Sequence, residues 1–197
     1  MSSKFYNFVW TVMHGFYAVV HPPKVYGREN LPAEGGCVLC INHFSNHDPV
    51  YIASCLPRKR RLYFLAKKQL FDNKFTRPIV TWLGAIPVDR GNADIAAVRS
   101  ALKVVKDGGT LGIFPQGTRS LDNSPTPMLN GASMIALRAG APVIPAYIDG
   151  PYRLFRRTAV RIGPAVDLSA FGRRCDSATL TEVTHCIESA IWGMRDT

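Results

Sequence analysis

The fold is decided by the stretch CVLCINHFSNHD, residues 37–48. Its first five residues are apolar and predict a buried strand, and the polar residues that follow predict a loop. Pro49 suits the first turn of a helix, which indicates that a short helix begins near Asp48. His43 therefore lies where a strand ends and a helix begins. Open α/β sheets place their functional residues in such loops, at the carboxyl ends of parallel strands.

His43 and Asp48 are candidates for a catalytic pair. A neutral imidazole accepts a proton near pH 7, and a carboxylate on its other nitrogen fixes the tautomer and stabilises the imidazolium. Five residues apart, the two would lie on different faces of one helix, so His43 must precede the helix and Asp48 must start it. The alternative is a hydrogen-bonded loop with Asp48 as a helix cap. His47 has no third ligand at a suitable spacing, so no metal site is predicted.

Apolar runs alternate with helical patterns along the rest of the chain. Further strands are predicted at residues 62–66, 85–88, 110–114, 143–148, 158–162 and 165–168. Helices are predicted at residues 50–56, 71–83, 93–106 and 130–139, and a last helix is opened by Asp176 and a Thr179–Glu182 capping box. Residues 24–36, rich in Gly and Pro, predict a connector. This alternation is typical of an α/β domain with a mainly parallel sheet flanked by helices.

Four short motifs follow one another along the chain. They are NHFSNHD at residues 42–48, GAIPVDR at 84–90, FPQGTRS at 114–120 and VIPA at 143–146. In order and separation they resemble the four signatures of the glycerolipid acyltransferases, and they are most similar to those of the 1-acylglycerol-3-phosphate acyltransferases. The resemblance covers most of the chain. It implies an O-acyltransferase that moves a fatty acyl chain from a thioester donor to 1-acylglycerol-3-phosphate, giving phosphatidic acid in phospholipid biosynthesis.

The resemblance also implies a mechanism. His43, oriented by Asp48, would remove the proton from the acceptor hydroxyl, and the alkoxide would attack the thioester of acyl-CoA or acyl-carrier protein directly. No G-x-S-x-G elbow is present, so no acyl-enzyme is expected. No cofactor is implied beyond the acyl donor, which is a substrate.

Four further positions are expected to bind substrate. Arg90 and Arg119 would hold the acceptor phosphate, because the planar guanidinium makes two charge-assisted bonds to phosphate. Gly117 and Thr118 would help to stabilise developing negative charge.

Gln116 is counted with the substrate-binding residues, and it departs from the family pattern. The third signature usually reads FPEGTRS, and glutamine keeps a carbonyl acceptor but loses the charge of glutamate. The exchange is expected to leave the His43–Asp48 pair untouched. It leaves open another lyso-lipid acceptor.

Residues 5–20 predict an apolar helix that ends at Pro22. Its stripe and the residues that widen it are Phe5, Phe8, Val9, Val12, Phe16 and Val19, with Tyr6, Trp10, Met13 and Tyr17. A bilayer span needs about 20 apolar residues, so this helix is too short. It could pack on the domain or lie in a membrane surface, and the resemblance favours the membrane. We expect residues 1–23 to form an amphipathic membrane-associated helix, ahead of an acyltransferase domain at residues 24–197. The protein would be peripheral or monotopic at the cytoplasmic face of the cell membrane.

The chain carries 24 Lys and Arg against 14 Asp and Glu, a net charge of +10, which favours anionic partners. The densest basic run is residues 58–61. The expected partners are a lysophospholipid, acyl-CoA or acyl-carrier protein, and a membrane surface. Nucleic acid is not expected, since the aromatic residues are not interleaved with basic ones and no zinc-finger or RNP-like motif is present. A non-catalytic basic protein, binding a membrane surface or nucleic acid, is the alternative.

The five cysteines do not form a disulfide pattern. Cys37 and Cys40 make a C-x-x-C motif, but on a strand their side chains point to opposite faces. We expect buried, inert thiols in a reducing compartment.

Overall fold

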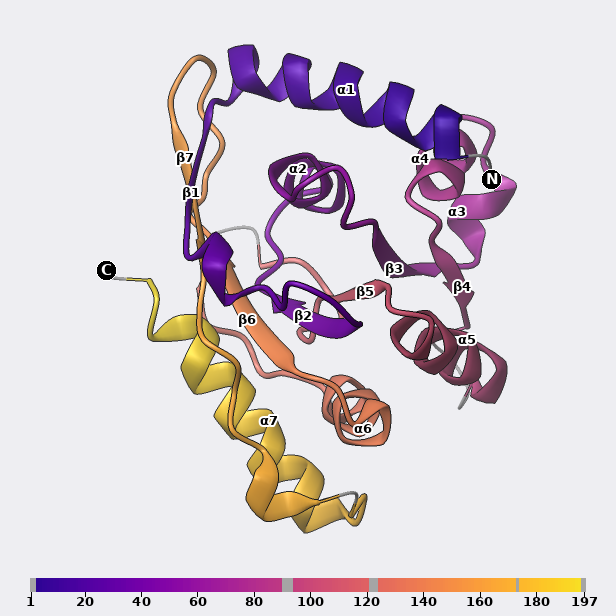
Figure 1. Ribbon diagram of the computed structural model, residues 1–197, viewed down its shortest axis with the longest axis vertical. Coiled ribbons are helices and arrows are strands. Elements are labelled where there is room, and N and C mark those ends of the chain that lie inside the picture. Colours follow the sequence, from indigo (N-terminus) through magenta and orange to yellow (C-terminus); the bar gives the residue numbers. More distant parts are fainter. Residues whose placement is uncertain (1–2, 90–93, 121–123, 173, 196–197) are drawn as a thin grey trace.

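The computed structural model describes residues 3–89, 94–120, 124–172 and 174–195. Its centre is a seven-stranded sheet with the order β1-β7-β6-β2-β5-β3-β4 (Figure 1). The strands are β1 Pro23–Tyr26, β2 Cys37–Ile41, β3 Leu62–Lys67, β4 Ile86–Val88, β5 Thr110–Ile113, β6 Val143–Ile148 and β7 Thr158–Ile162. Strands β2 to β6 run parallel, while β7 is antiparallel to β6 and parallel to β1. The predicted mainly parallel α/β fold is confirmed.

Helices cover both faces of the sheet (Figure 1). They are α1 Ser3–Val20, α2 Asp48–Cys55, α3 Gln69–Asp72, α4 Arg77–Trp82, α5 Ile95–Lys106, α6 Asn130–Ala139 and α7 Ser177–Trp192, with 3-10 turns at Arg28–Asn30 and Ser169–Phe171. One hydrophobic core lies between the sheet and α1 with α2, and the other lies between the sheet and α5, α6 and α7. The central strand β2 is buried on both faces, which explains its unbroken apolar run.

The cysteines of β2 divide between the two cores, as the strand period predicts. Cys37 belongs to the core beneath α1 and α2, and Cys40 belongs to the core above α6 and α7. Burial raises the pKa of Cys40 and of Cys55 to about 12, so both thiols stay protonated at neutral pH. None of the five cysteines forms a disulfide.

Two strand predictions are corrected by the structure. Residues 23–26 are not part of a connector but form the edge strand β1, whose pattern is too short to be detected and whose partner is the distant β7. The strand predicted at 165–168 is wrong. Pro164 offers no N–H to a ladder, and the segment stays irregular although the Val166 N–H donates to the Val143 carbonyl at 2.8 Å.

The helix predicted at residues 71–83 is interrupted. α3 ends at Asp72 and α4 begins at Arg77. Pro78 lacks an N–H, and its ring would clash inside a continuing helix, so it occupies the first turn of a new one.

The last helix begins as expected at its Asp176 cap, which accepts the Thr179 N–H at 2.9 Å. The predicted capping box is wrong, because Thr179 lies inside the helix in the position that receives the cap.

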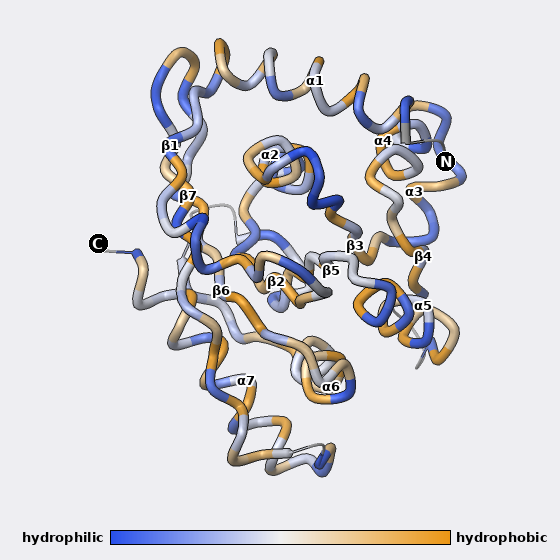
Figure 2. The backbone as a smooth tube through the Cα atoms, viewed as in Figure 1, coloured by the Kyte–Doolittle hydropathy of each residue, from blue (hydrophilic) through white to orange (hydrophobic). Residues whose placement is uncertain are grey.

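The N-terminal helix α1 packs on α2 through one face and leaves the other exposed. The Trp10 indole donates to the Ala53 carbonyl at 3.1 Å, and the Tyr6 and Tyr17 rings are buried. Most of the predicted stripe lies on the exposed face, namely Phe5, Phe8, Val12, Phe16 and Val19. Figure 2 shows hydrophobic residues along this outer edge. Within the described residues, the helices lack the combined length and apolarity that a bilayer crossing requires.

Candidate active site

The structure brings the His43 and Asp48 side chains together. His43 lies in the irregular segment after β2, and Asp48 is the first residue of α2. The distance from His43 Nδ1 to Asp48 Oδ2 is 2.8 Å. An ionised carboxylate only accepts, so Nδ1 carries the proton and Nε2 keeps its lone pair. The His43 side chain is 18% exposed, so a substrate hydroxyl can approach it.

Asp48 is fully buried, and hydrogen bonds compensate for the loss of water around its charge. Its Oδ2 atom also accepts the backbone N–H groups of Phe44 and Ser45, each at 2.8 Å. These bonds fold the loop around the carboxylate and fix the approach of His43. The hydrogen-bonded loop of the alternative is thus present in the same group that holds the histidine, but Asp48 does not cap the helix: it is the first residue of α2, whose cap position is His47 and has no side-chain cap bond.

Tyr152 completes the surroundings of Asp48 and was not predicted from the sequence. Its hydroxyl donates to Asp48 Oδ1 at 2.9 Å from the segment between β6 and β7. Burial, and next the negative charge of Asp48, raise the pKa of Tyr152 well above its ordinary value, so the hydroxyl remains a donor. The partners are 104 positions apart in the sequence, so no local pattern could reveal the contact.

A stack of two aromatic rings packs against one face of the His43 imidazole. The His43 ring stacks on Phe114 with centroids 4.1 Å apart, and Phe114 stacks on Phe64 at 5.3 Å. Gly112 makes room for this stack, since a Cβ there would lie 2.4 Å from an atom of the Phe64 ring. The strands β3 and β5 therefore help to fix the position of the His43 ring.

Gln116 links the third motif to the first. Its Oε1 atom accepts the His43 backbone N–H at 2.6 Å, and its Nε2 atom donates to the Thr126 hydroxyl. The side chain is buried. This contact ties position 116 to the backbone of His43 itself, a link that the sequence did not predict, and the effect of the Glu-to-Gln exchange on the pair stays a prediction.

Asn42 anchors the start of the loop. Its side chain accepts the Ile148 N–H at 2.7 Å and donates to the Ile148 carbonyl at 2.9 Å. The Ser120 N–H donates to the His43 carbonyl at 2.8 Å. The carboxyl ends of β2, β5 and β6 are thereby joined around His43, at the edge of the sheet where the sequence places the site.

The candidate phosphate-binding residues are only partly described. Arg90 lies outside the described residues. Thr118 and Arg119 are exposed beyond the end of β5, and Gly117 has a left-handed backbone with φ of 66°. A Cβ at Gly117 would lie 2.5 Å from the tip of the exposed Leu129 side chain, which can move aside, so it is the left-handed backbone that favours glycine here. Their roles in substrate binding stay predictions.

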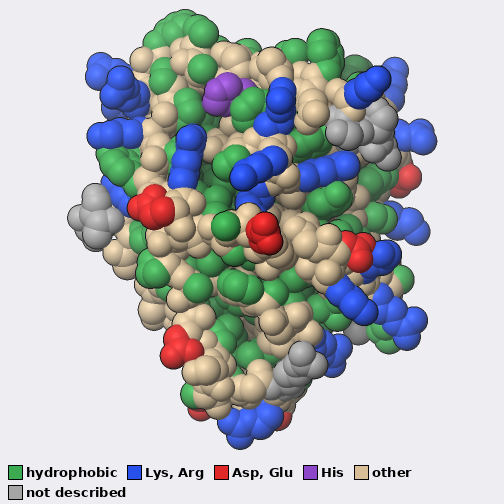
Figure 3. All heavy atoms as spheres, in the orientation of Figure 1, with side chains coloured by type: hydrophobic (Ala, Val, Ile, Leu, Met, Phe, Trp, Pro, Cys, Tyr) green, Lys and Arg blue, Asp and Glu red, His purple; other side chains and the backbone are tan. Residues whose placement is uncertain are grey.

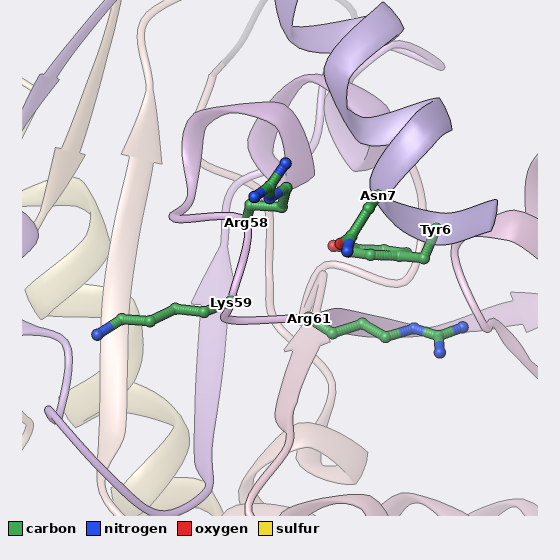
Figure 4. Close-up of a pocket in the computed structure, with 5 residues that line it drawn as sticks. All are labelled: Tyr6, Asn7, Arg58, Lys59 and Arg61. Carbon is green, nitrogen blue, oxygen red and sulfur yellow. The ribbon is translucent and has the colours of Figure 1, made fainter. Parts of the chain in front are cut away.

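A basic cavity of about 340 Å³ lies at the opposite edge of the sheet (Figure 4). Its lining residues are Tyr6, Asn7, Arg58, Lys59 and Arg61. The α2–β3 segment supplies the basic residues and precedes β3, so the cavity lies at the amino end of that strand, away from His43. In Figure 4 the Lys59 and Arg61 side chains point in opposite directions and do not converge on one ligand.

The basic run is more than a solvated surface. The Arg61 guanidinium lies over the Tyr6 and Tyr63 rings at 4.9 and 4.8 Å, and Arg60 donates to the Thr110 hydroxyl at 3.0 Å. Arg58 and Lys59 are exposed. Figure 3 shows Lys and Arg side chains gathered beneath α1 on the visible face. Across the described ranges, no group of three His, Cys, Asp or Glu residues is arranged to hold a metal ion.

Known proteins share this sequence pattern. The acyltransferase family model matches residues 22–149. The 1-acyl-sn-glycerol-3-phosphate acyltransferase of Bacillus subtilis is 32% identical over 174 residues, which cover 85% of each chain. The protein of that name from Salmonella typhimurium is 29% identical over 175 residues, covering 82% of this chain and 70% of the relative. The Streptococcus pneumoniae protein of that name is 29% identical, and the chain spans 55% of its length.

A solved structure shares the fold. The 1-acyl-sn-glycerophosphate (LPA) acyltransferase PlsC from Thermotoga maritima matches with a TM-score of 0.71 at 22% sequence identity, covering 98% of this chain and 83% of that chain. The family match extends over more than half of the sequence and contains all four motifs. This chain therefore belongs to the acyltransferase family, among the 1-acylglycerol-3-phosphate acyltransferases.

Proposed function

We propose that this protein transfers a fatty acyl chain from a thioester donor to the free hydroxyl of 1-acylglycerol-3-phosphate, forming phosphatidic acid. The observation that carries the proposal is the 2.8 Å contact between His43 Nδ1 and the buried Asp48 carboxylate. It leaves the Nε2 atom of the partly exposed His43 side chain as a base at the carboxyl end of β2. The names of the relatives support the acceptor.

The reaction needs one proton acceptor and no covalent intermediate on the enzyme. His43 Nε2 takes the proton of the acceptor hydroxyl as the oxygen bonds to the thioester carbonyl carbon. The tetrahedral intermediate collapses, the carbon–sulfur bond breaks, and the imidazolium returns the proton to the leaving thiolate. Asp48 stabilises the imidazolium between the two transfers. The products are the new ester and the free thiol of the carrier.

Arg119, together with Arg90, would bind the acceptor phosphate. Backbone groups at Gly117 would face the developing oxyanion, because glycine lets the chain approach closely. Acyl-CoA and acyl-carrier protein both satisfy the chemistry as donors. Gln116 is compatible with 1-acylglycerol-3-phosphate as the acceptor. Its amide is buried and bonded within the protein, and glutamine in place of glutamate adds no charge to the substrate path.

We further propose that the protein works as a peripheral enzyme on the cytoplasmic face of the cell membrane. The acceptor and the product are membrane lipids. The exposed apolar face of α1 supports this placement, since an amphipathic helix of this kind buries its apolar side at the head-group boundary.

A thiol-release assay tests the proposed reaction. Detergent-purified protein is given acyl-CoA or acyl-carrier protein, with and without 1-acylglycerol-3-phosphate, and Asp48→Asn is compared with wild type. We expect release that requires the acceptor and that falls roughly 10²-fold or more in Asp48→Asn, because an amide cannot stabilise the imidazolium. Release without acceptor, or no release with either donor across several lyso-lipids, would contradict the proposal.

A further inference from the structure

The segment between β6 and β7 carries a second exposed apolar surface, separate from the exposed face of α1. Leu154 and Phe155 are 68% and 72% exposed. Burying such side chains in an apolar phase is favourable, so their exposure side by side marks a contact surface. We call residues 153–157 the hairpin tip.

The hairpin tip is fixed to the end of α1. The Phe155 N–H donates to the Val20 carbonyl at 2.8 Å, and the buried His21 ring bonds the Arg153 carbonyl through Nδ1 at 3.1 Å. In Figure 1 this loop rises beside α1 at the end where the helix meets β1. The tip therefore extends the exposed stripe of α1 beyond Val19.

The backbone holds the Phe155 ring outward at a cost. Its φ is 59°, a left-handed conformation that is an outlier for a bulky side chain. Such conformations persist where the surroundings impose them, and they concentrate at functional positions. The bond from the Phe155 N–H to the Val20 carbonyl holds this backbone, and it leaves the ring 72% exposed.

Charge identifies the occupant of the surface. Arg153, Arg156 and Arg157 are exposed on either side of the apolar pair. Arginines around an aromatic and an aliphatic side chain match an anionic lipid surface, where rings sit at head-group depth and guanidinium groups bind phosphate. If two copies of the chain paired through this surface, the arginines of one copy would face the arginines of the other.

We propose that the hairpin tip inserts into anionic lipid beside α1 and seats the catalytic loop against the bilayer. Tyr152, which holds Asp48 at 2.9 Å, lies one residue before the tip. The same segment thus supports the catalytic carboxylate and contacts the phase that contains the lipid acceptor. The inference rests on the proposed acyl transfer for its purpose, but not for its test.

The test separates lipid binding from catalysis. A tip variant, Leu154→Ser with Phe155→Asn, removes the apolar pair while asparagine tolerates the left-handed backbone. A charge variant, Arg156→Gln with Arg157→Gln, keeps the apolar pair. Ile95→Ser on the distant helix α5 is the matched control, because Ile95 is similarly exposed, at 64%. Each protein is sedimented with vesicles of phosphatidylcholine alone or mixed equally with phosphatidylglycerol, and turnover is measured with a short-chain, water-soluble acceptor.

The tip variant should bind both kinds of vesicle about tenfold more weakly or worse, as removal of two buried apolar side chains implies. The charge variant should lose about fivefold per arginine, on the anionic vesicles only. Turnover of the soluble acceptor should stay within about twofold of wild type in both, and Ile95→Ser should bind normally. Absence of soluble turnover in every protein would count against acyl transfer to this acceptor while leaving the lipid result readable.

Unchanged vesicle binding in the tip variant would overturn the inference, as would a wild type that does not bind vesicles. If the tip variant fails to fold, the charge variant decides the test. In that case, a charge variant that binds the anionic vesicles as tightly as wild type would overturn the inference. If the wild type is a dimer, and the tip variant is a monomer with unchanged vesicle binding, the surface would instead be the interface with a second copy.

Discussion

At the scale of single residues, the site depends on how one buried charge is held. Asp48 accepts hydrogen bonds from the His43 ring, two backbone N–H groups and the Tyr152 hydroxyl. Hydrogen bonds to a charged group are stronger than neutral ones, and removing one from a buried carboxylate leaves part of its desolvation uncompensated. We expect these additional contacts to Asp48 to decide whether His43 is held in the orientation that the proposed reaction needs.

Tyr152→Phe should weaken both folding and catalysis. The ring packing on Phe44 and Tyr51 is kept, while the hydroxyl bond to Asp48 is lost. We expect the free energy of unfolding to fall by about 1.5–3 kcal/mol, and turnover to fall roughly tenfold as the carboxylate loses its position. Urea unfolding and thiol release measure the two effects. Tyr26→Phe, at an exposed tyrosine, should change neither, and wild-type turnover in Tyr152→Phe would remove its positioning role.

The two substitutions Gln116→Ala and Gln116→Glu should differ in effect. Alanine leaves the His43 backbone N–H without its acceptor, at a cost of about 1–3 kcal/mol, and turnover should fall roughly tenfold. Glutamate can still accept that N–H, and the Thr126 hydroxyl can turn to donate, so turnover should stay within about twofold of wild type. Steady-state kinetics with one donor compare them. Equal activity of the alanine variant would show that the contact between the motifs is dispensable.

At the scale of elements, the strand ends position the chemistry and the helices fix its surroundings. β2 delivers His43, β5 delivers Gln116, and the β6–β7 segment delivers Tyr152. The aromatic stack from Phe64 through Phe114 connects β3 and β5 to the imidazole. A change inside the sheet should therefore shift the His43 ring without contacting it directly.

Gly112→Ala tests this connection. The new methyl group would lie 2.4 Å from the Phe64 ring, so Phe64 and then Phe114 must shift. We expect a loss of about 1–3 kcal/mol of unfolding free energy from overpacking, with a fall in turnover. Gly131→Ala is the control, because nothing lies within 4 Å of the Cβ that it adds. Destabilisation without any change in turnover would disconnect the stack from catalysis.

At the scale of the whole molecule, the sequence predicted the architecture but not the long-range contacts. Local apolar patterns identified β2, β3, β4, β5, β6 and β7 from the sequence. β1 was missed, since only the distant β7 makes it a strand. Likewise, motif spacing brought His43 and Asp48 together, whereas Tyr152 and the role of Gln116 arise from chain crossings that carry no local signal.

The fold as a whole should lose stability in alkali. Burial, and next the charge of Asp48, raise the pKa of Tyr17 to about 12 from an ordinary value near 10. Tyr17 is neutral in both states below about pH 10, and above it the unfolded chain ionises first, so the unfolding free energy should fall from about pH 10 to 12. Urea unfolding measures this slope, and Tyr17→Phe should flatten it. The same slope in that variant would rule out Tyr17 as a source.

The central claim is that His43 acts as the base for acyl transfer, and the rate of phosphatidic acid formation by His43→Ala tests it most directly. The rate is measured on folded protein with acyl-CoA or acyl-carrier protein and 1-acylglycerol-3-phosphate, with His47→Ala as the control, since His47 is an exposed histidine in the same loop. We predict a loss of about 10²–10⁴-fold for His43→Ala and a rate near wild type for His47→Ala. A near-normal rate in His43→Ala would contradict the account.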